Sequence, residues 1–223
     1  MMNKKSILLS VSLLSILMFV GCAPKTIKTK NLEYSNRFYL TSDTSRGALH
    51  LVIQVEIPVK FSNKAVLDSV RSKLIANLFG DKYVSLPLDS IIPTFVADQN
   101  EDYRNNNLPM LQAPNLHSYF SFNNEHILEG ISLWSDENIF SYGIKRYVFM
   151  GGAHGLNTQI FLNFDLKTGK ILTENDLFVP NYTEELTKII RSRMVEENKE
   201  LADYGDLNQT DYWVDSIQPN GNF

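Results

Sequence analysis

The sequence predicts an α+β fold in which an antiparallel meander sheet packs against amphipathic helices. Residues 48–58 alternate apolar and polar side chains, which is the period of a strand buried on one face. A helical pattern of apolar residues follows at once, over residues 62–79. Residues 116–165 then contain strand-like runs separated by short turns, which indicates antiparallel pairing. These three observations together are typical of an α+β layer.

Composition and charge narrow the class of protein. The chain has 223 residues, of which 43% are apolar and 11% aromatic, enough for one large or two small domains with a buried core. The first 22 residues contain two lysines, so the remainder carries 19 basic and 25 acidic residues, a formal charge of −6. An acidic chain lacks the basic face that nucleic acids require, so we expect no nucleic-acid partner.

The N-terminus has the pattern of an export signal. Lys4 and Lys5 precede an apolar run over residues 7–20, which is too short to span a bilayer. The run ends in Phe19-Val-Gly-Cys22, which resembles the lipobox of bacterial lipoproteins, and Cys22 is the only cysteine. We therefore expect residues 1–22 to be a lipoprotein signal peptide, with Cys22 lipidated. Because no Asp follows Cys22, we expect a lipid anchor in the outer membrane of a Gram-negative envelope. The sequence does not indicate which face of that membrane carries the protein.

The first half of the mature chain is predicted in order. Residues 23–36 are polar and are expected to form a tether. Asn63 is a candidate N-cap for the helix over residues 62–79, and Gly80 is a candidate C′ residue. Residues 84–115 contain four prolines and many polar side chains, which favours a long solvated loop, with at most a short helix around it. Its acidic stretch fails as a calcium loop because Tyr103 stands where the sharp turn needs glycine, so no metal site is predicted.

The meander leads to a glycine-rich loop that contains a histidine. Strands are predicted over residues 116–122, 127–134, 139–150 and 160–165, and a tight turn over residues 167–170. Between the last two strands lie Gly151, Gly152, His154 and Gly155, where the backbone must bend or adopt φ > 0. After the turn, Thr173 is expected to cap a short helix and Asn181 a longer one. At residues 221–223 a strand is expected to start, so the last domain is predicted to be incomplete.

Several interpretations of His154 remain open. It could be a general base, a metal ligand or a binding contact displayed by the glycines, or a structural histidine that hydrogen-bonds the loop backbone. The structural interpretation is favoured, because His50, His117 and His126 show no ligand spacing and no catalytic serine motif is present. Asp165 is most simply a turn residue. The aromatic residues of the meander are expected mainly in the core, the alternative being a platform for stacking sugars.

The residues from Tyr147 to Gly155, followed by Asn163-Phe-Asp-Leu-Lys-Thr-Gly-Lys170, resemble the paired domains of RsiV-type anti-sigma factors. Similar domains occur in PdaC-type peptidoglycan deacetylases and in bacterial lipoproteins. The resemblance implies a first α+β domain over residues 37–165 and a second over residues 166–223. It also implies an envelope module whose partner is a lysozyme-like protein or peptidoglycan.

The sequence therefore favours a binding or sensor module without catalytic residues, cofactor or metal. Its hypothetical contact residues are Gly151, Gly152, His154 and Gly155. Two alternatives remain, namely an envelope hydrolase that uses His154 with a nearby carboxylate, and a structural lipoprotein without a dedicated ligand.

Overall fold

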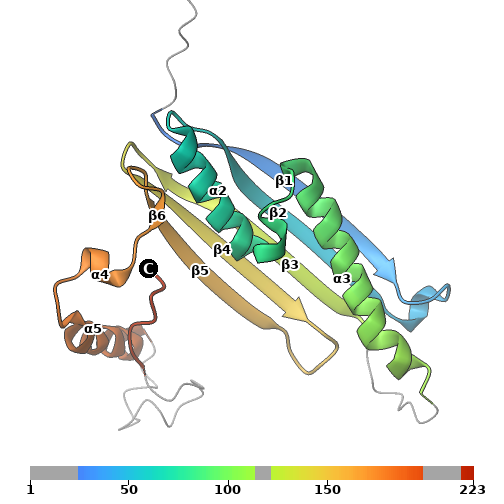
Figure 1. Cartoon of the computed structure of the whole chain (residues 1–223). Coiled ribbons are helices and arrows are strands. Elements are labelled where there is room, and N and C mark those ends of the chain that lie inside the picture. The colour runs from blue at the N-terminus through green and yellow to red at the C-terminus, as the bar shows by residue number, and fades with distance from the viewer. Residues whose placement is uncertain (1–24, 114–121, 198–216) are drawn as a thin grey trace, which may run out of the picture.

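A computed structural model describes residues 25–113, 122–197 and 217–223. Its described strands form one six-stranded sheet in the order β1-β2-β3-β4-β5-β6 (Figure 1). The strands are β1 (Lys28–Tyr39), β2 (Ala48–Lys60), β3 (Asn124–Ser135), β4 (Ile139–Phe149), β5 (Leu156–Asp165) and β6 (Lys170–Ile171). The helices are η1 (Thr44–Arg46), α2 (Lys64–Leu78), η2 (Asp81–Tyr83), α3 (Leu88–Leu111), α4 (Glu174–Leu177) and α5 (Tyr182–Glu197). The predicted α+β class is confirmed.

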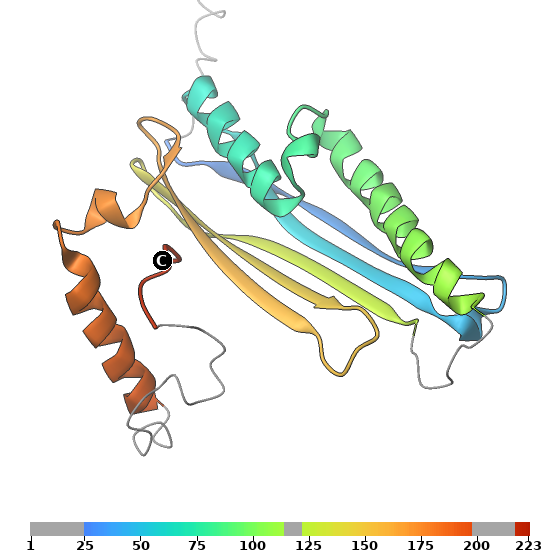
Figure 2. The same cartoon turned by 60° about the horizontal axis from the view of Figure 1, so that its bottom comes forward.

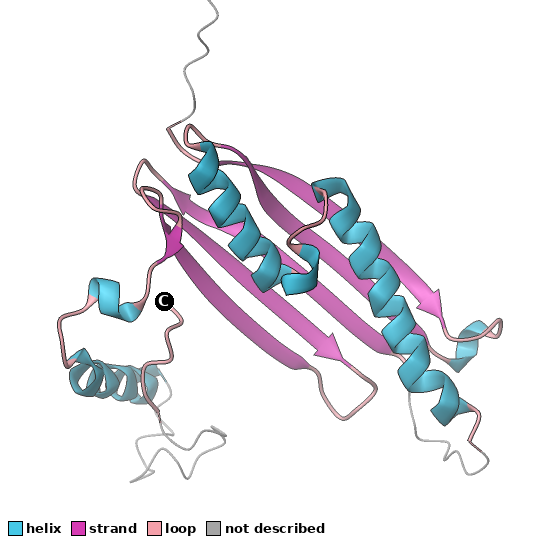
Figure 3. Cartoon of the chain, in the orientation of Figure 1, coloured by secondary structure: helices cyan, strands magenta, loops and turns pink. Residues whose placement is uncertain are grey.

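The molecule has two layers, with α2 and α3 on one face of the sheet (Figures 2 and 3). The core lies between these layers. It contains the alternate side chains of β2 that the sequence predicted and the inward face of α2, among them Leu49, Leu51, Ile53, Val55, Ile57, Val66, Val70 and Leu74. Phe140, Tyr142, Ile144 and Phe164 complete it from β4 and β5. Burial of these side chains is what fixes the register of each strand.

Helix α2 begins and ends where the sequence predicted. The Asn63 side chain accepts a hydrogen bond from Val66 N at 3.3 Å, which satisfies one of the free N–H groups of the first turn. Gly80 follows the helix with φ = 112°, a conformation that a residue with a side chain rarely adopts. The strand and the helix that open the core were therefore both readable from local pattern.

The predicted loop over residues 84–115 is wrong, because residues 88–111 form α3. Pro93 and Pro109 lie inside this helix, although a proline removes a backbone hydrogen bond and disfavours a helix interior. The helix forms because Ile91, Val96 and Tyr103 bury on the sheet side, and burial outweighs the cost of the prolines. The Tyr103 hydroxyl also donates a hydrogen bond to Phe122 O at 3.0 Å.

Two features of the sheet also differ from the prediction. Residues 28–36 belong to β1, so a tether over residues 23–36 is wrong for most of its length. Strand β1 pairs antiparallel with β2, and its partly buried Leu32, Tyr34 and Phe38 pack on the core while its other side chains face solvent. In addition, β2 and β3 are parallel, because α2 and α3 carry the chain back across the sheet between them. The antiparallel meander is confirmed from β3 to β6.

The C-terminal elements lie beyond the β5 edge of the sheet (Figure 1). Thr173 and Asp176 form the predicted capping box of α4, with Thr173 N donating to Asp176 Oδ2 at 2.7 Å. Asn181 directly precedes α5, as predicted. Its φ is 69°, a left-handed conformation that asparagine tolerates, whereas a usual N-cap residue is extended. The apolar face of α5 packs on Ile217 through Ile190, Met194 and Val195. The signal segment with Cys22 and residues 116–121 of the strand predicted over residues 116–122 lie outside the described residues. No described helix could cross a bilayer.

Candidate functional site

The glycine-histidine loop joins β4 to β5 at one end of the sheet. Gly151 has φ = 84°, as the sequence predicted, and Gly155 lies so close to the Tyr147 ring that a Cβ would overlap it. His154 is exposed and makes no hydrogen bond or ion pair with any described residue. The favoured interpretation, a histidine that hydrogen-bonds the loop backbone, is therefore wrong. Gly151 and Gly155 shape the turn, whereas Gly152 has neither a positive φ nor a neighbour within 4 Å of an added Cβ, so the structure gives no reason for a glycine there. His154 projects from the loop.

His154 and Asp165 flank opposite ends of β5. The ten residues of this strand rise about 3.3 Å each, which separates its ends by roughly 30 Å. The Asp165 carboxylate accepts hydrogen bonds from Lys167 N at 2.9 Å and from the Thr168 hydroxyl at 2.7 Å. Those hydrogen bonds lower the pKa of Asp165, that from Thr168 most. Asp165 is thus a turn residue, and the two side chains cannot act together as an acid and base.

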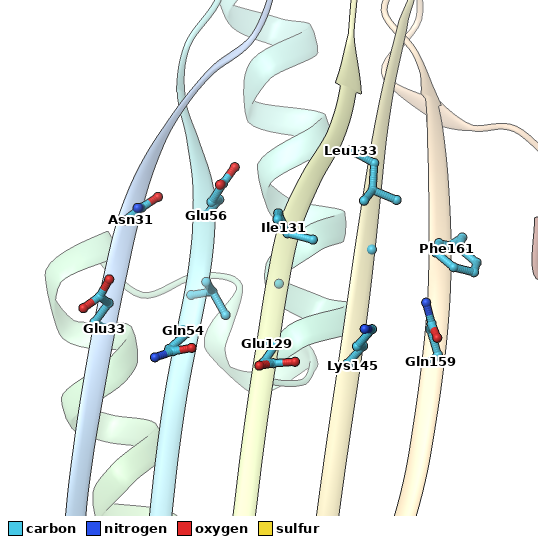
Figure 4. Close-up of a pocket in the computed structure, with 13 residues that line it drawn as sticks. Asn31, Glu33, Gln54, Glu56, Glu129, Ile131, Leu133, Lys145, Gln159 and Phe161 are labelled. Atoms are coloured by element: carbon cyan, nitrogen blue, oxygen red, sulfur yellow. The ribbon is translucent and has the colours of Figure 1, made fainter.

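A different set of residues forms a recessed site on the sheet face opposite α2 and α3. Five polar side chains from five strands stand side by side there, since each is the register partner of the next across β1 to β5. We call this set the polar row, and it consists of Glu33, Gln54, Glu129, Lys145 and Gln159. Figure 4 shows these side chains in line across the sheet, with the helices behind it. The side-chain ends of the polar row make no hydrogen bond or ion pair with described residues, so they are available to a ligand.

A hollow of about 560 Å³ lies over the polar row and the next set of residues along the strands. Its floor includes Gly143, where an added Cβ would lie 3.2 Å from Leu133 Cδ1 and 3.7 Å from Phe161 Cδ1. The absence of a side chain at Gly143 therefore opens the space between Leu133 and Phe161. Leu133 and Ile131 are 51% and 52% exposed, although both are large apolar side chains. The hollow combines a polar side with an apolar side, which is common in ligand sites.

Glu56 borders the hollow and is held in place by three strands. Its Oε2 accepts hydrogen bonds from the Thr29 hydroxyl of β1 and from Ser132 N of β3, both at 3.2 Å. Its backbone carbonyl accepts a hydrogen bond from the Tyr142 hydroxyl of β4 at 2.7 Å. Burial raises the pKa of Tyr142, so this hydroxyl stays protonated and remains a donor. One carboxylate of the site is thus oriented before any ligand binds.

Comparison with known proteins identifies the fold. No family model matches the chain, and neither does any curated protein. The chain is similar to the crystal structure of a DUF3298 family member from Bacteroides fragilis, with a TM-score of 0.77 and 24% identity over 88% of this chain and 79% of that chain. This chain has the fold of that DUF3298 protein. A DUF3298 family protein from Pseudomonas aeruginosa also matches, with a TM-score of 0.47 and 16% identity over 78% of this chain and 68% of that chain.

The hollow was not predicted from the sequence, in which the glycine-histidine loop was the candidate contact region instead. The polar positions of β2, Gln54 among them, were readable from the alternation over residues 48–58. Gly130 and Gly143 were the unused signal, because a glycine inside a strand often marks close approach by another group. Gly143 faces the hollow, whereas Gly130 faces the core and makes room for Tyr142. Trp134 is exposed, while Tyr142 and Phe164 are fully buried, so the aromatic residues divide between surface and core.

Proposed function

We propose that this chain is a lipid-anchored, non-catalytic binding module of the bacterial cell envelope, and that its hollow binds a glycan strand of peptidoglycan. The observation that carries the proposal is the polar row beside the apolar wall of Leu133 and Phe161. Sugar rings present hydroxyl groups at their edges and C–H groups on their faces. Amide and carboxylate side chains can hydrogen-bond the hydroxyls while an aromatic ring covers the C–H face.

The shape of the hollow supports an extended ligand. The polar row crosses five strands, which lie about 4.8 Å apart, so it spans roughly 19 Å. That is longer than one sugar ring, and a short oligosaccharide would contact several members of the row at once. The side chains of the polar row make no hydrogen bond with other described residues. Binding to them would therefore not require existing side-chain hydrogen bonds to break.

The lipid anchor would hold the module close to the membrane. Only five residues separate Cys22 from the start of β1 at Lys28. A fully extended chain spans at most about 3.6 Å per residue, so the reach from Cys22 to Lys28 is roughly 20 Å. The sheet would therefore sample envelope polymers near the surface to which Cys22 is attached.

A lysozyme-like protein is a second candidate partner, favoured by charge. The chain without residues 1–22 has a formal charge of −6, and the described lining of the hollow has three acidic residues, Glu33, Glu56 and Glu129, against one basic residue, Lys145. This distribution would attract a basic protein. The resemblance to RsiV-type domains implies the same class of partner.

The test uses a soluble form that begins at Lys25, which retains the Lys25–Glu137 ion pair at 2.8 Å and the buried Ile27. Its retention on purified peptidoglycan and on immobilised lysozyme is measured for the wild type and for Gly143→Val combined with Glu129→Gln. We expect retention of the wild type and at least a tenfold weaker association of the double variant, because it fills the floor and removes a charge. Glu101→Gln, an exposed change on α3, is the matched control.

Each outcome has a distinct meaning. Peptidoglycan retention that the double variant loses supports the glycan proposal, and lysozyme retention alone supports the second candidate. Equal retention of the double variant and wild type would show that the hollow is not the site. Retention of neither ligand would leave the interpretation of a structural lipoprotein.

A further inference from the structure

The outer edge of β5 has no complete strand partner among the described residues. Strand β6 pairs only with Phe164 and Asp165, so the longer part of β5 ends the sheet on this side. Alternate residues of an edge strand direct their N–H and C=O groups outward, where they can pair with another chain. Gln159 and Phe161 are two such residues on β5.

The C-terminal segment already imitates a neighbouring strand at this edge. The Asn222 side chain accepts a hydrogen bond from Phe161 N at 2.7 Å and donates one to Gln159 O at 3.0 Å. A side-chain amide carries a C=O acceptor and N–H donors, so Asn222 fills the two hydrogen-bonding positions that an added strand would use beside Gln159 and Phe161. Next to it, Asn163 Nδ2 donates to Phe223 O at 2.6 Å.

A groove surrounds this contact. It encloses about 490 Å³ and is lined by β5, by residues 171–175 and by the C-terminal segment. Figure 2 shows the segment in red between β5 and α5. Glu174 is the only charged side chain of its described lining, and Glu174 Oε1 accepts a hydrogen bond from Gly221 N at 2.8 Å. The groove therefore offers the outward N–H and C=O groups of β5 to a ligand, together with a carboxylate that favours a positive charge beside them.

We propose that the outer edge of β5 is a docking site for an extended, basic peptide segment of a partner protein. The segment pairs with Gln159 and Phe161 as an additional strand after it displaces residues 220–223. Residues 220–222 are exposed and a few hydrogen bonds hold them, so an incoming strand that forms a longer ladder can replace them. A lysine of that segment lies beside Glu174.

The test uses the Lys25-initiated protein and a synthetic peptide of alternating lysine and valine. Binding is measured by fluorescence anisotropy, and protection of the β5 amides by hydrogen exchange. We expect binding with protection of Phe161 N–H, and about tenfold tighter binding by Asn222→Ala, because two competing hydrogen bonds are removed. Gln218→Ala, an exposed change in the same segment, should bind as the wild type does. A peptide methylated at alternate backbone nitrogens keeps its charge but cannot pair, and should not bind.

Three results would overturn the proposal. The wild type and Asn222→Ala could both fail to bind the peptide. The methylated peptide could bind equally well, which would mean that charge alone attracts it. Asn222→Ala could instead form dimers without peptide, which would make a second copy of the chain the occupant. The Asn222 side chain hydrogen-bonds the backbone of Gln159 and Phe161 and not their side chains, which line the hollow. Peptidoglycan retention should therefore be the same for Asn222→Ala and wild type, which distinguishes the two tests.

Discussion

The Tyr142 hydroxyl donates a hydrogen bond to Glu56 O at 2.7 Å, although β3 lies between the strands that carry these two residues. Gly130 of β3 makes this possible, because its missing side chain leaves room for the Tyr142 ring. The described β2–β3 ladder ends at the Val55–Gly130 pair, next to Glu56. Tyr142 therefore links β4 to β2 just beyond that ladder, and the same link positions Glu56 at the hollow.

Gly130→Ala should destabilise the fold. The added Cβ would collide with the Tyr142 hydroxyl and approach Leu78 Cδ2 at 3.0 Å, so we expect a loss of about 1–3 kcal/mol in the free energy of unfolding. Urea denaturation measures the change. Combining it with Tyr142→Phe relieves the collision, so the effects of the two substitutions should not add. Simple additivity would contradict the packing of Tyr142 across Gly130.

Phe161→Leu should weaken glycan binding without unfolding the sheet. Phe161 is only partly buried and faces the hollow. The change removes an aromatic surface, and we expect the binding free energy to weaken by about 0.5–1.5 kcal/mol. Titration with peptidoglycan fragments is expected to show up to tenfold weaker affinity. Phe149→Leu, near the far end of the same sheet face, is the matched control and should bind normally.

His154→Ala should change little. The side chain is exposed and has no described partner, so we expect the free energy of unfolding to change by less than about 0.5 kcal/mol. Gly151→Ala in the same loop should be clearly more destabilising, because Gly151 has φ = 84°, a conformation that a residue with a side chain rarely adopts. Thermal denaturation compares the two. Loss of a hydrolytic activity on peptidoglycan in His154→Ala would revive a catalytic role.

Asp165→Asn should reduce stability in a pH-dependent way. The folded-state pKa of Asp165 is lowered by hydrogen bonds from Thr168 and Lys167, so its ionised form stabilises the fold at pH values above about 4. That contribution is lost as the pH falls through the lowered pKa. Urea midpoints of wild type and variant should therefore differ at pH 7 and converge near pH 2. Asp102→Asn, at an exposed carboxylate without a described partner, is the matched control for the loss of a charge.

Cys22→Ala should abolish lipid attachment. The sequence predicts that Cys22 is acylated, and several acyl chains on one residue give durable anchoring. Metabolic labelling with a fatty acid should mark the wild type and leave the variant unmarked, while fractionation moves the protein out of the membrane pellet. Equal labelling of the two would contradict the anchor.

Local patterns predicted a large part of this fold. The alternation in β2, the cap at Asn63 and the turn at Asp165 were each readable, because the residues that determine them are close in sequence. Helix α3 was missed because Pro93 and Pro109 oppose helix formation locally, whereas the burial that overrides them involves distant strands. Strand β1 was missed because an edge strand buries only a few side chains.

The hollow was not predictable by the same means. Alternation indicates which side chains of a strand share a face, but not which strands are neighbours. Glu33 and Gln54 come from the first hairpin, whereas Glu129 reaches Gln54 only because β2 and β3 pair in parallel. The antiparallel meander that the sequence predicted would not have placed the carboxylates of Glu33 and Glu129 on either side of Gln54. The loop around His154 drew attention because its glycines are close together in the chain, but Gly151 and Gly155 serve the turn.

The parallel junction between β2 and β3 also determines how the chain can assemble. Ala48 and Asn123, which meet beside this junction, are 75 residues apart, whereas β3, β4 and β5 join through short hairpins. Closing a long loop has a larger entropic cost than zipping a hairpin, so the hairpins can form early and the β2–β3 contact later. During that interval the free side of β3 is a template for intermolecular pairing, and the speed with which β2 arrives sets how long nascent chains are prone to aggregate.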